Sequence, residues 1–315
     1  MLRETYCVDP PAAVQPFVDH FREVFGEGLA AVVFYGSRLD GALSSETSTF
    51  DFYLVCDEYS QVFSRRRDRL LARVLPPSIY SLDLPVDGDV RRCKYCVISR
   101  DDLRREVGAG ANDFYHLGRF SKRLAVVWTR DSYERDEVLA CCWQAMRTIT
   151  EHAINKVSNE FTLDEFILKA LALSYEAEVR LEKTDEKVRR LFDSAKQFYR
   201  HAYSILLAEL RDVSPDLFHT PQEDDPAESY FLRRSVSQRA RMHEETRYLI
   251  KRSRRRGKLR WPKNIVLVDN WVDPLLEKVE RTYGVKIELT PTERRWFLIF
   301  GWKHYFRLKR EGKIR

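Results

Sequence analysis

The feature that most constrains this sequence is a short apolar run that ends in Gly-Ser and is followed by a second run with an early acid. Residues Ala30 to Tyr35 are apolar and rich in β-branched and aromatic types, so they predict a buried strand. Gly36-Ser37 follows and lets the backbone turn sharply and approach a phosphate with its amides and a hydroxyl. A second strand is predicted from Phe50 to Cys56, with Asp51 near its start.

A carboxylate beside a phosphate-binding turn is what metal-dependent nucleotidyl transfer requires. A divalent cation takes hard oxygen ligands and neutralises a triphosphate, and an acid such as Asp51 fixes the cation. Tyr35-Gly36-Ser37 with Asp51 resembles the opening of the nucleotidyltransferase fold of the DNA polymerase β type. That pattern has two acids flanking one apolar residue, and Tyr53 stands here in the second position. Taken alone, the pattern leaves open a catalytically inactive relative.

Composition indicates a folded chain with a basic C-terminal quarter. The 315 residues are 44% hydrophobic, enough for two or three compact units, so disorder is not expected. The net charge is +6, and nine Lys or Arg lie between residues 247 and 263 and eight between 294 and 315. Cys93 and Cys96 have the spacing of a zinc or redox pair, but no second pair matches it. Reduced cysteines are therefore expected.

The chain shows no sign of secretion or of membrane insertion. Residues 1–11 lack an apolar signal core, and no apolar stretch approaches the roughly 20 residues of a membrane span. We expect a cytoplasmic protein that is peripheral on the inner face of a membrane.

The hydrophobic patterns change from mixed to helical along the chain, which predicts an α+β fold with a mixed sheet. Strands are predicted at 78–84, 92–98 and 124–129, and helices at 14–25, 65–75, 136–157, 163–175, 185–210 and 230–251. Thr162 and Glu165 predict a capping box, and Ser99 predicts a helix N-cap. We expect a nucleotidyltransferase domain over 1–131, a winged-helix-like helical domain over 132–228 and a basic helical region over 229–315.

Four stretches together resemble the mitochondrial translocator assembly and maintenance family of phosphatidate cytidylyltransferases. They are Tyr35-Gly36-Ser37 with Asp51-Phe52, then Lys94-Tyr95-Cys96-Val97-Ile98-Ser99, then Tyr115 to Lys122, and finally Leu173-Ser174-Tyr175 with Arg180 and Lys187. The family also has an apolar residue after its Asp-Phe pair, so Tyr53 fits it. The resemblance implies a peripheral enzyme that makes CDP-diacylglycerol and pyrophosphate from CTP and phosphatidic acid with Mg²⁺.

The resemblance also assigns roles to individual residues. Asp51 and Lys94 are the implied catalytic residues, and Asp51 is the implied metal ligand. The residues implied to bind the nucleotide and its phosphates are Tyr35, Gly36, Ser37, Arg119, Lys122, Ser174, Tyr175, Arg180 and Lys187. A second metal ligand is left open among Asp57, Glu58 and Asp83.

Some positions depart from the family pattern and keep alternatives open. Cys96 replaces a glycine and Arg123 a proline, while Ala111 and Val62-Phe63 stand where aromatic residues and a histidine are expected. One alternative is a nucleotidyltransferase with a soluble phosphate acceptor. Another is a decayed relative whose Arg run binds nucleic acid, which is disfavoured because few aromatics interleave the run. The sequence leaves the acyl preference and the oligomeric state open.

The C-terminal segment from Thr292 to Arg315 combines aromatic and basic residues. We predict that it lies in an anionic membrane surface as an interfacial helix. The predicted membrane contacts are Trp296, Phe297, Trp302, Phe306, Arg307, Lys309 and Arg310. The alternative is that the aromatics dock into the protein's own core.

Overall fold

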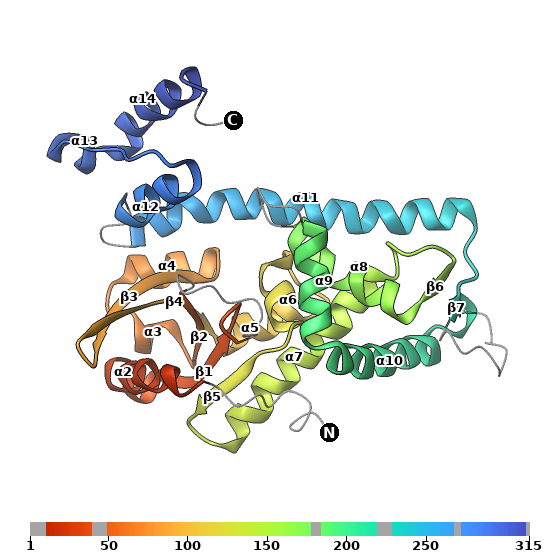
Figure 1. The fold of residues 1–315 in the computed structure, drawn as a ribbon. Helices are drawn as coiled ribbons and strands as arrows, with labels where there is room; N and C mark the ends of the chain where they lie inside the picture. The colour runs from red at the N-terminus through yellow and green to blue at the C-terminus, as the bar shows by residue number, and fades with distance from the viewer. Residues whose placement is uncertain (1–10, 40–48, 178–183, 219–228, 268–271, 313–315) are drawn as a thin grey trace. The chain divides into compact units, whose positions relative to one another are not determined.

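The computed structural model describes residues 11–39, 49–177, 184–218, 229–267 and 272–312 of the chain. They belong to two compact units, Met1–Lys263 and Asn264–Arg315. Figure 1 shows the elements in chain order. The first unit carries all the predicted nucleotide-binding residues.

The first unit is built on a five-stranded mixed sheet in the order β3-β4-β2-β1-β5. Its strands are β1 (Leu29–Tyr35), β2 (Phe50–Cys56), β3 (Ser78–Val86), β4 (Asp89–Ser99) and β5 (Ala125–Thr129). β2 and β4 are parallel, and the other neighbours are antiparallel. The sheet and its helices confirm the predicted α+β class.

Both faces of the sheet are covered, because its central strands are apolar on both sides. On one face, Phe34 and Phe52 pack with Phe17 and Phe21 of the N-terminal helix α2. On the other face, residues such as Val33 share a core with α5, α6 and α7. The elements flanking the sheet are η1 (Ala12–Val14), α2 (Gln15–Phe25), η2 (Gly26–Gly28), α3 (Tyr59–Val62), α4 (Arg66–Val74), α5 (Arg100–Val107) and α6 (Phe114–Phe120).

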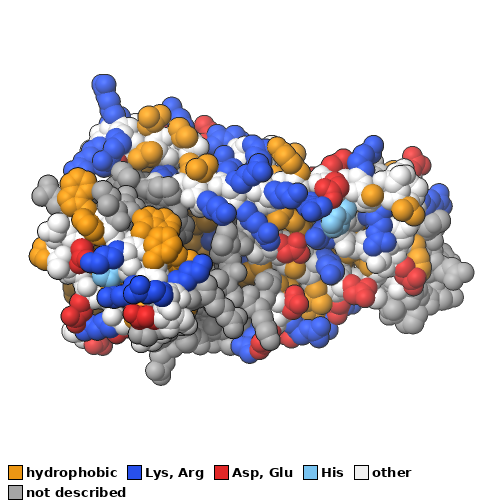
Figure 2. Space-filling model, turned by 90° about the horizontal axis from the view of Figure 1, so that it is seen from above, with side chains coloured by type: hydrophobic (Ala, Val, Ile, Leu, Met, Phe, Trp, Pro, Cys, Tyr) orange, Lys and Arg blue, Asp and Glu red, His pale blue; other side chains and the backbone are white. Residues whose placement is uncertain are grey.

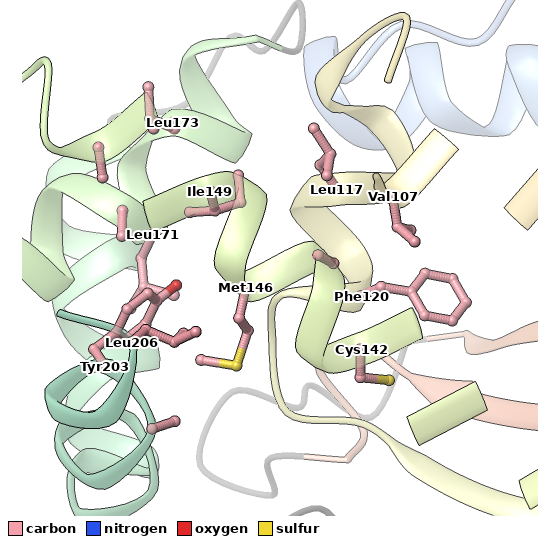
Figure 3. Packing of buried hydrophobic residues seen from close by; sticks show 14 of the residues in the cluster. Val107, Leu117, Phe120, Cys142, Met146, Ile149, Leu171, Leu173, Tyr203 and Leu206 are labelled. Carbon is pink, nitrogen blue, oxygen red and sulfur yellow. The ribbon is translucent and has the colours of Figure 1, made fainter. Parts of the chain in front are cut away.

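The core that contains Val33 continues from the sheet into the helical segment. Figure 3 shows Val107, Leu117 and Phe120 from the sheet side close to Met146 and Ile149 of α7. The helical segment comprises α7 (Ser132–Ala153), α8 (Leu163–Glu176), α9 (Thr184–Ser194), α10 (Lys196–Val213) and η4 (Pro215–Leu217), with a small sheet of β6 (Glu160–Thr162) and β7 (Ser229–Phe231). The domain division at 131 and 228 stays a prediction.

Local signals for helix starts were reliable, whereas two helix lengths were not. The Thr162–Glu165 capping box and the Ser99 N-cap are confirmed. The single helix predicted over 185–210 is wrong, because Ala195 adopts a non-helical conformation between α9 and α10. The prediction that a helix ends at Lys251, before the run Arg254-Arg255-Arg256, is also wrong. One helix, α11 (Val236–Leu267), continues through that run.

Helix α11 joins the helical segment to the sheet through side chains along its length. Asn155, beyond α7, donates to Thr246, and Arg254 donates to the carbonyl of Glu176 in α8. Further along, Lys263 donates to the carbonyls of Leu75 and Pro77, just before β3. Figure 2 looks down on the side of the molecule along which α11 runs in Figure 1 and shows many Lys and Arg side chains there.

The second unit contains α12 (Val272–Tyr283), α13 (Pro291–Arg295) and α14 (Phe297–Arg310). Thr290 and Glu293 form a capping box at α13, and Glu293 also lies 3.4 Å from the buried His304 of α14. In the described part of the chain, no helix combines the length and hydropathy that crossing a membrane requires.

Candidate active site

The turn after β1 lies directly against Asp51. Tyr35 is the register partner of Asp51, and Gly36 has a φ of +94°, a backbone conformation that favours glycine. A β-carbon at Gly36 would lie 2.7 Å from Asp51 Oδ2, closer than such atoms normally approach. Glycine is therefore required here both for the turn and for the space beside the carboxylate.

Lys94 completes a row of polar side chains across three neighbouring strands. It is the parallel register partner of Asp51, which in turn pairs with Tyr35. Side chains two residues apart share a sheet face, so all three lie on the same face as the buried Tyr53. Lys94 is exposed, which leaves its ammonium accessible to an anion from solvent.

Tyr53, where the general pattern has its second acid, is part of the core. It is 1% exposed, its ring centroid lies 5.1 Å from that of Tyr35, and its hydroxyl lies 3.3 Å from Nδ1 of His116. Burial raises the pKa of Tyr53 well above its ordinary value, so the phenol stays neutral. Tyr53 therefore packs in the core next to Tyr35, and its neutral phenol is not a metal ligand.

Cys96 links the sheet to α6. Its sulfur lies 3.7 Å from the Tyr35 hydroxyl and 3.8 Å from the Tyr115 hydroxyl. The guanidinium carbon of Arg119 lies 3.7 Å from the centre of the Tyr115 ring. Through Tyr115 and Cys96, these contacts connect Arg119 to Tyr35 at the end of β1. The fold therefore brings Arg119 to the predicted site.

Helices α6 and α8 meet through the two predicted motifs. A β-carbon at Gly118 would lie 2.4 Å from Cβ of Ser174, so only glycine allows this approach. Ser174 is buried, and its hydroxyl donates to the carbonyl of Leu171. Lys122 lies 4.0 Å from the centre of the Tyr175 ring, within the range of a cation–π contact. The structure thus gives Ser174 a packing role, and its phosphate-binding role stays a prediction.

The last two predicted phosphate-binding residues are Arg180 and Lys187. Lys187 is half-buried on α9, a helix that packs against α8. Arg180 lies outside the described residues. Their predicted roles remain predictions.

The three acids considered as a second metal ligand lie in different places. Asp57 follows the opposite end of β2 and pairs with Arg100 and Arg130. Glu58 accepts from Ser60 at the start of α3. Asp83 lies on the Asp51 face of the sheet, two strands away, and forms an ion pair with Arg92.

The site fits a cation that arrives with its nucleotide better than a cage built by the protein. Among the described residues, no three His, Cys, Asp or Glu side chains lie close enough together to hold a metal ion. Mg²⁺ is commonly held by one or two carboxylates together with substrate phosphates and waters. Asp51, whose carboxylate lies against Gly36, can supply one such carboxylate.

Sequence reasoning missed the contribution of α11. Arg256 and Arg260 both pair with the buried Asp113, and Lys263 is also buried. Burial, assisted by the charge of Arg260, lowers the pKa of Lys263 to about 7. The four-residue spacing of Arg256 and Arg260 placed them on one helix face, a signal that the high local charge concealed.

The second unit exposes much of its predicted membrane-contact surface. Trp296, Trp302 and Phe306 are 53%, 60% and 62% exposed. Phe297 is half-buried, and Arg307, Lys309 and Arg310 are exposed. The alternative that these aromatics dock into the core of their own unit therefore does not hold for Trp302 and Phe306.

A glycine turn beside an acid on a mixed sheet, with basic residues on the next strand and helix, is typical of a nucleotidyltransferase. A search of curated proteins found no match. The sequence model of the family described as mitochondrial phosphatidate cytidylyltransferase matches residues 73–269, more than half of the chain. The chain belongs to this family and is an enzyme of the nucleotidyltransferase class. The match includes Lys94, Arg119 and α8 and begins after Asp51.

Proposed function

We propose that the protein transfers the cytidylyl group of CTP to phosphatidic acid with the help of Mg²⁺. An acceptor phosphate oxygen attacks the α-phosphorus of CTP, a new P–O bond forms, and the bond to the β-phosphate breaks. CDP-diacylglycerol and pyrophosphate are the products. The observation that carries this proposal is Asp51, held between the Gly36 turn and Lys94 in a chain of this family.

Each residue of the row has a task in such a reaction. Bound Mg²⁺ would neutralise charge on the triphosphate and the leaving pyrophosphate. Asp51 would hold the cation, and Lys94 would supply a second positive charge from the next strand. The amides and hydroxyl at Gly36-Ser37 would orient phosphate oxygens, as backbone groups at a phosphate-binding turn do. Arg119 and Lys122 would bind the nucleotide from the helical side.

The acceptor is the part of the proposal that needs its own test. The departures at Ala111 and at Val62-Phe63 from the family pattern motivate a soluble phosphate acceptor as the second candidate. In the structure, Ala111 is packed within the core. Radiolabelled CTP should be incubated with phosphatidic acid and with soluble phosphate compounds, with and without Mg²⁺. We expect labelled lipid only with phosphatidic acid and Mg²⁺. Labelling of a soluble compound alone would replace the lipid assignment.

The nucleic-acid alternative loses support because much of the Arg run is occupied within the protein. Arg254 donates to Glu176, Arg252 to Asn112, and Arg256 and Arg260 pair with Asp113. These arginines hold their part of α11 to the other elements of the first unit. A retention assay with RNA should therefore show weak binding that salt removes.

We further propose that the second unit binds an anionic membrane surface and makes the enzyme peripheral on the inner face. Exposed aromatics and basic residues on one short helix suit the interface, and each basic residue near such a surface adds about 1 kcal/mol. Deleting residues 292–315 should abolish pelleting with phosphatidic-acid vesicles and spare CTP binding.

Point variants of α14 test the same surface without truncation. Replacing Trp302 and Phe306 by Ala should weaken pelleting, because both side chains are exposed. Tyr283→Ala, which removes a partly exposed aromatic of α12, serves as the matched control. Undiminished pelleting of the truncated protein at physiological salt would place the anchor elsewhere.

A further inference from the structure

A cluster of buried charges on α6 and α11 is not used by the reaction described above. Its acid is Asp113, fully buried at the start of α6, and its bases are Arg256 and Arg260 of α11. Burial would by itself raise the pKa of Asp113, but Arg260 first of all holds it below its ordinary value. An ionised acid at this depth is costly unless it is fully hydrogen-bonded, so the geometry of the cluster is tightly defined.

Arg260 is fixed at three points. Nη2 donates to Asp113 Oδ2 at 2.7 Å, Nε donates to the carbonyl of Pro76 at 2.9 Å, and the guanidinium carbon lies 4.6 Å from the centre of the Tyr115 ring. The side chain is 4% exposed. A planar guanidinium can donate to an acid and a carbonyl within its plane while its face lies against an aromatic ring.

The guanidinium of Arg119 lies over the same Tyr115 ring. Its guanidinium carbon lies 3.7 Å from the Tyr115 ring centre, and its Nη1 donates to the Tyr115 carbonyl at 2.9 Å. Asp113 in turn accepts from the backbone amide of Tyr115. Tyr115 is therefore held by the cluster at its backbone and at its ring, and Arg119 is held by Tyr115.

We propose that Arg260 is a positioning residue for nucleotide binding, which acts through Tyr115 to set the direction of the Arg119 guanidinium. This inference rests on the proposed function and adds the distant helix α11 to the nucleotide site. Arg260 itself touches Asp113, Pro76 and Tyr115, so its effect on the nucleotide is indirect.

Arg256 provides a matched control on the same helix. It pairs with the same Asp113 oxygen at 2.6 Å, one turn of α11 away from Arg260. Arg256→Ala removes a positive charge from the cluster and leaves Asp113 paired with Arg260. A general loss of stability or of charge would affect both variants, whereas loss of the Tyr115 contact affects only Arg260 variants.

Calorimetric titration of CTP into the full chain tests the proposal. Arg260→Lys keeps the charge beside Asp113 and removes the planar group, so we expect CTP affinity to fall roughly tenfold, as for a lost charge-assisted hydrogen bond. Arg256→Ala should stay within about twofold of wild type, because Asp113 keeps its pair with Arg260 and Arg260 keeps its contact with Tyr115. Tyr115→Leu should resemble Arg260→Lys, because it removes the ring on which both guanidinium groups lie. Melting temperatures of all variants confirm that each is folded at the titration temperature.

A double-mutant cycle provides the decisive readout. If Arg260 acts through Arg119, the Arg119→Ala and Arg260→Lys double variant should bind CTP no more weakly than Arg119→Ala alone. Additive losses, or wild-type affinity in Arg260→Lys, would overturn the inference while the proposed function stands. A wild-type protein that bound no CTP would remove the proposed function and this inference together.

Discussion

Strand β2 has an acid near each end, and the two acids have different surroundings. Asp51 and Asp57 lie about 20 Å apart at about 3.3 Å per residue of extended chain. Asp57 is enclosed by Arg100 and Arg130, which both also pair with the buried Glu134. Asp51 faces the Gly36 turn and the strand that carries Lys94.

The comparison shows how neighbours assign a role to an acid. Two arginines compensate Asp57 inside the fold, so its charge supports structure. The glycine turn lets the Asp51 carboxylate lie close to the backbone that follows β1, and we propose that its charge holds a metal with its phosphates. One strand thus carries a proposed ligand end and a structural end.

The largest effect is expected from Asp51→Asn. The isosteric amide keeps the shape of the side chain and removes the charge that would hold the cation, so transfer should fall by a factor on the order of 10² or more. The melting temperature should stay unchanged. Activity is measured with labelled CTP and phosphatidic acid, and wild-type turnover in a folded variant would remove Asp51 from the site.

Gly36→Ala should have the next largest effect, at the same end of β2. The new methyl group would lie 2.7 Å from Asp51 Oδ2 and strain a backbone with a φ of +94°, so Asp51 must move. A displacement of this kind costs up to about 100-fold in rate. Gly88→Ala, at a positive φ with open space around it, controls for backbone strain alone. Equal losses in the two variants would contradict the role of the space beside Asp51.

Lys94→Ala should weaken the use of CTP about tenfold, as expected for one charge-assisted phosphate contact. Because Lys94 is exposed, removing it should hardly change the melting temperature. The dependence of rate on CTP concentration provides the measurement. An unchanged dependence would show that Lys94 is only a surface charge.

Asp57→Asn should give the smallest effect on transfer and a clear effect on stability. Losing a partner of two arginines should cost about 1–2 kcal/mol of the free energy of unfolding, while activity stays near wild type. Denaturant titration measures this cost. A loss of activity as large as that of Asp51→Asn would break the distinction between the two ends.

The Asp57 end should also give the protein a pH dependence. A hydrogen bond from Arg130 above all holds the pKa of Asp57 below its ordinary value. Because the pKa of Asp57 is lower in the folded than in the unfolded protein, its ionised form stabilises the fold at pH values above the ordinary pKa of about 3.9. This stabilisation disappears as the pH falls through the lowered pKa. The acid unfolding curve of Asp57→Asn should lack this component.

Much of the sheet could be predicted because its signals are local. The bounds of β2 are those predicted, and the Thr162 capping box needs only residues within one helical turn. The break at Ala195 could not be predicted, since no Gly or Pro marks it in the sequence. The proximity of Gly36 and Asp51 was predictable, because consecutive strands pair and bring the end of β1 beside the start of β2. The contribution of Arg260 depends on Asp113, 147 residues away, and no local pattern reveals that pair.

The most direct test of the two ends of β2 is a titration of CTP into the protein at increasing Mg²⁺. Wild type and Asp57→Asn should bind CTP more tightly as Mg²⁺ rises, because Asp51 is intact in both and can hold the cation that the triphosphate brings. In Asp51→Asn, Mg²⁺ should no longer tighten binding. An Asp51→Asn protein whose CTP affinity responds to Mg²⁺ as wild type does would contradict the assignment of the metal and nucleotide to this end of the strand.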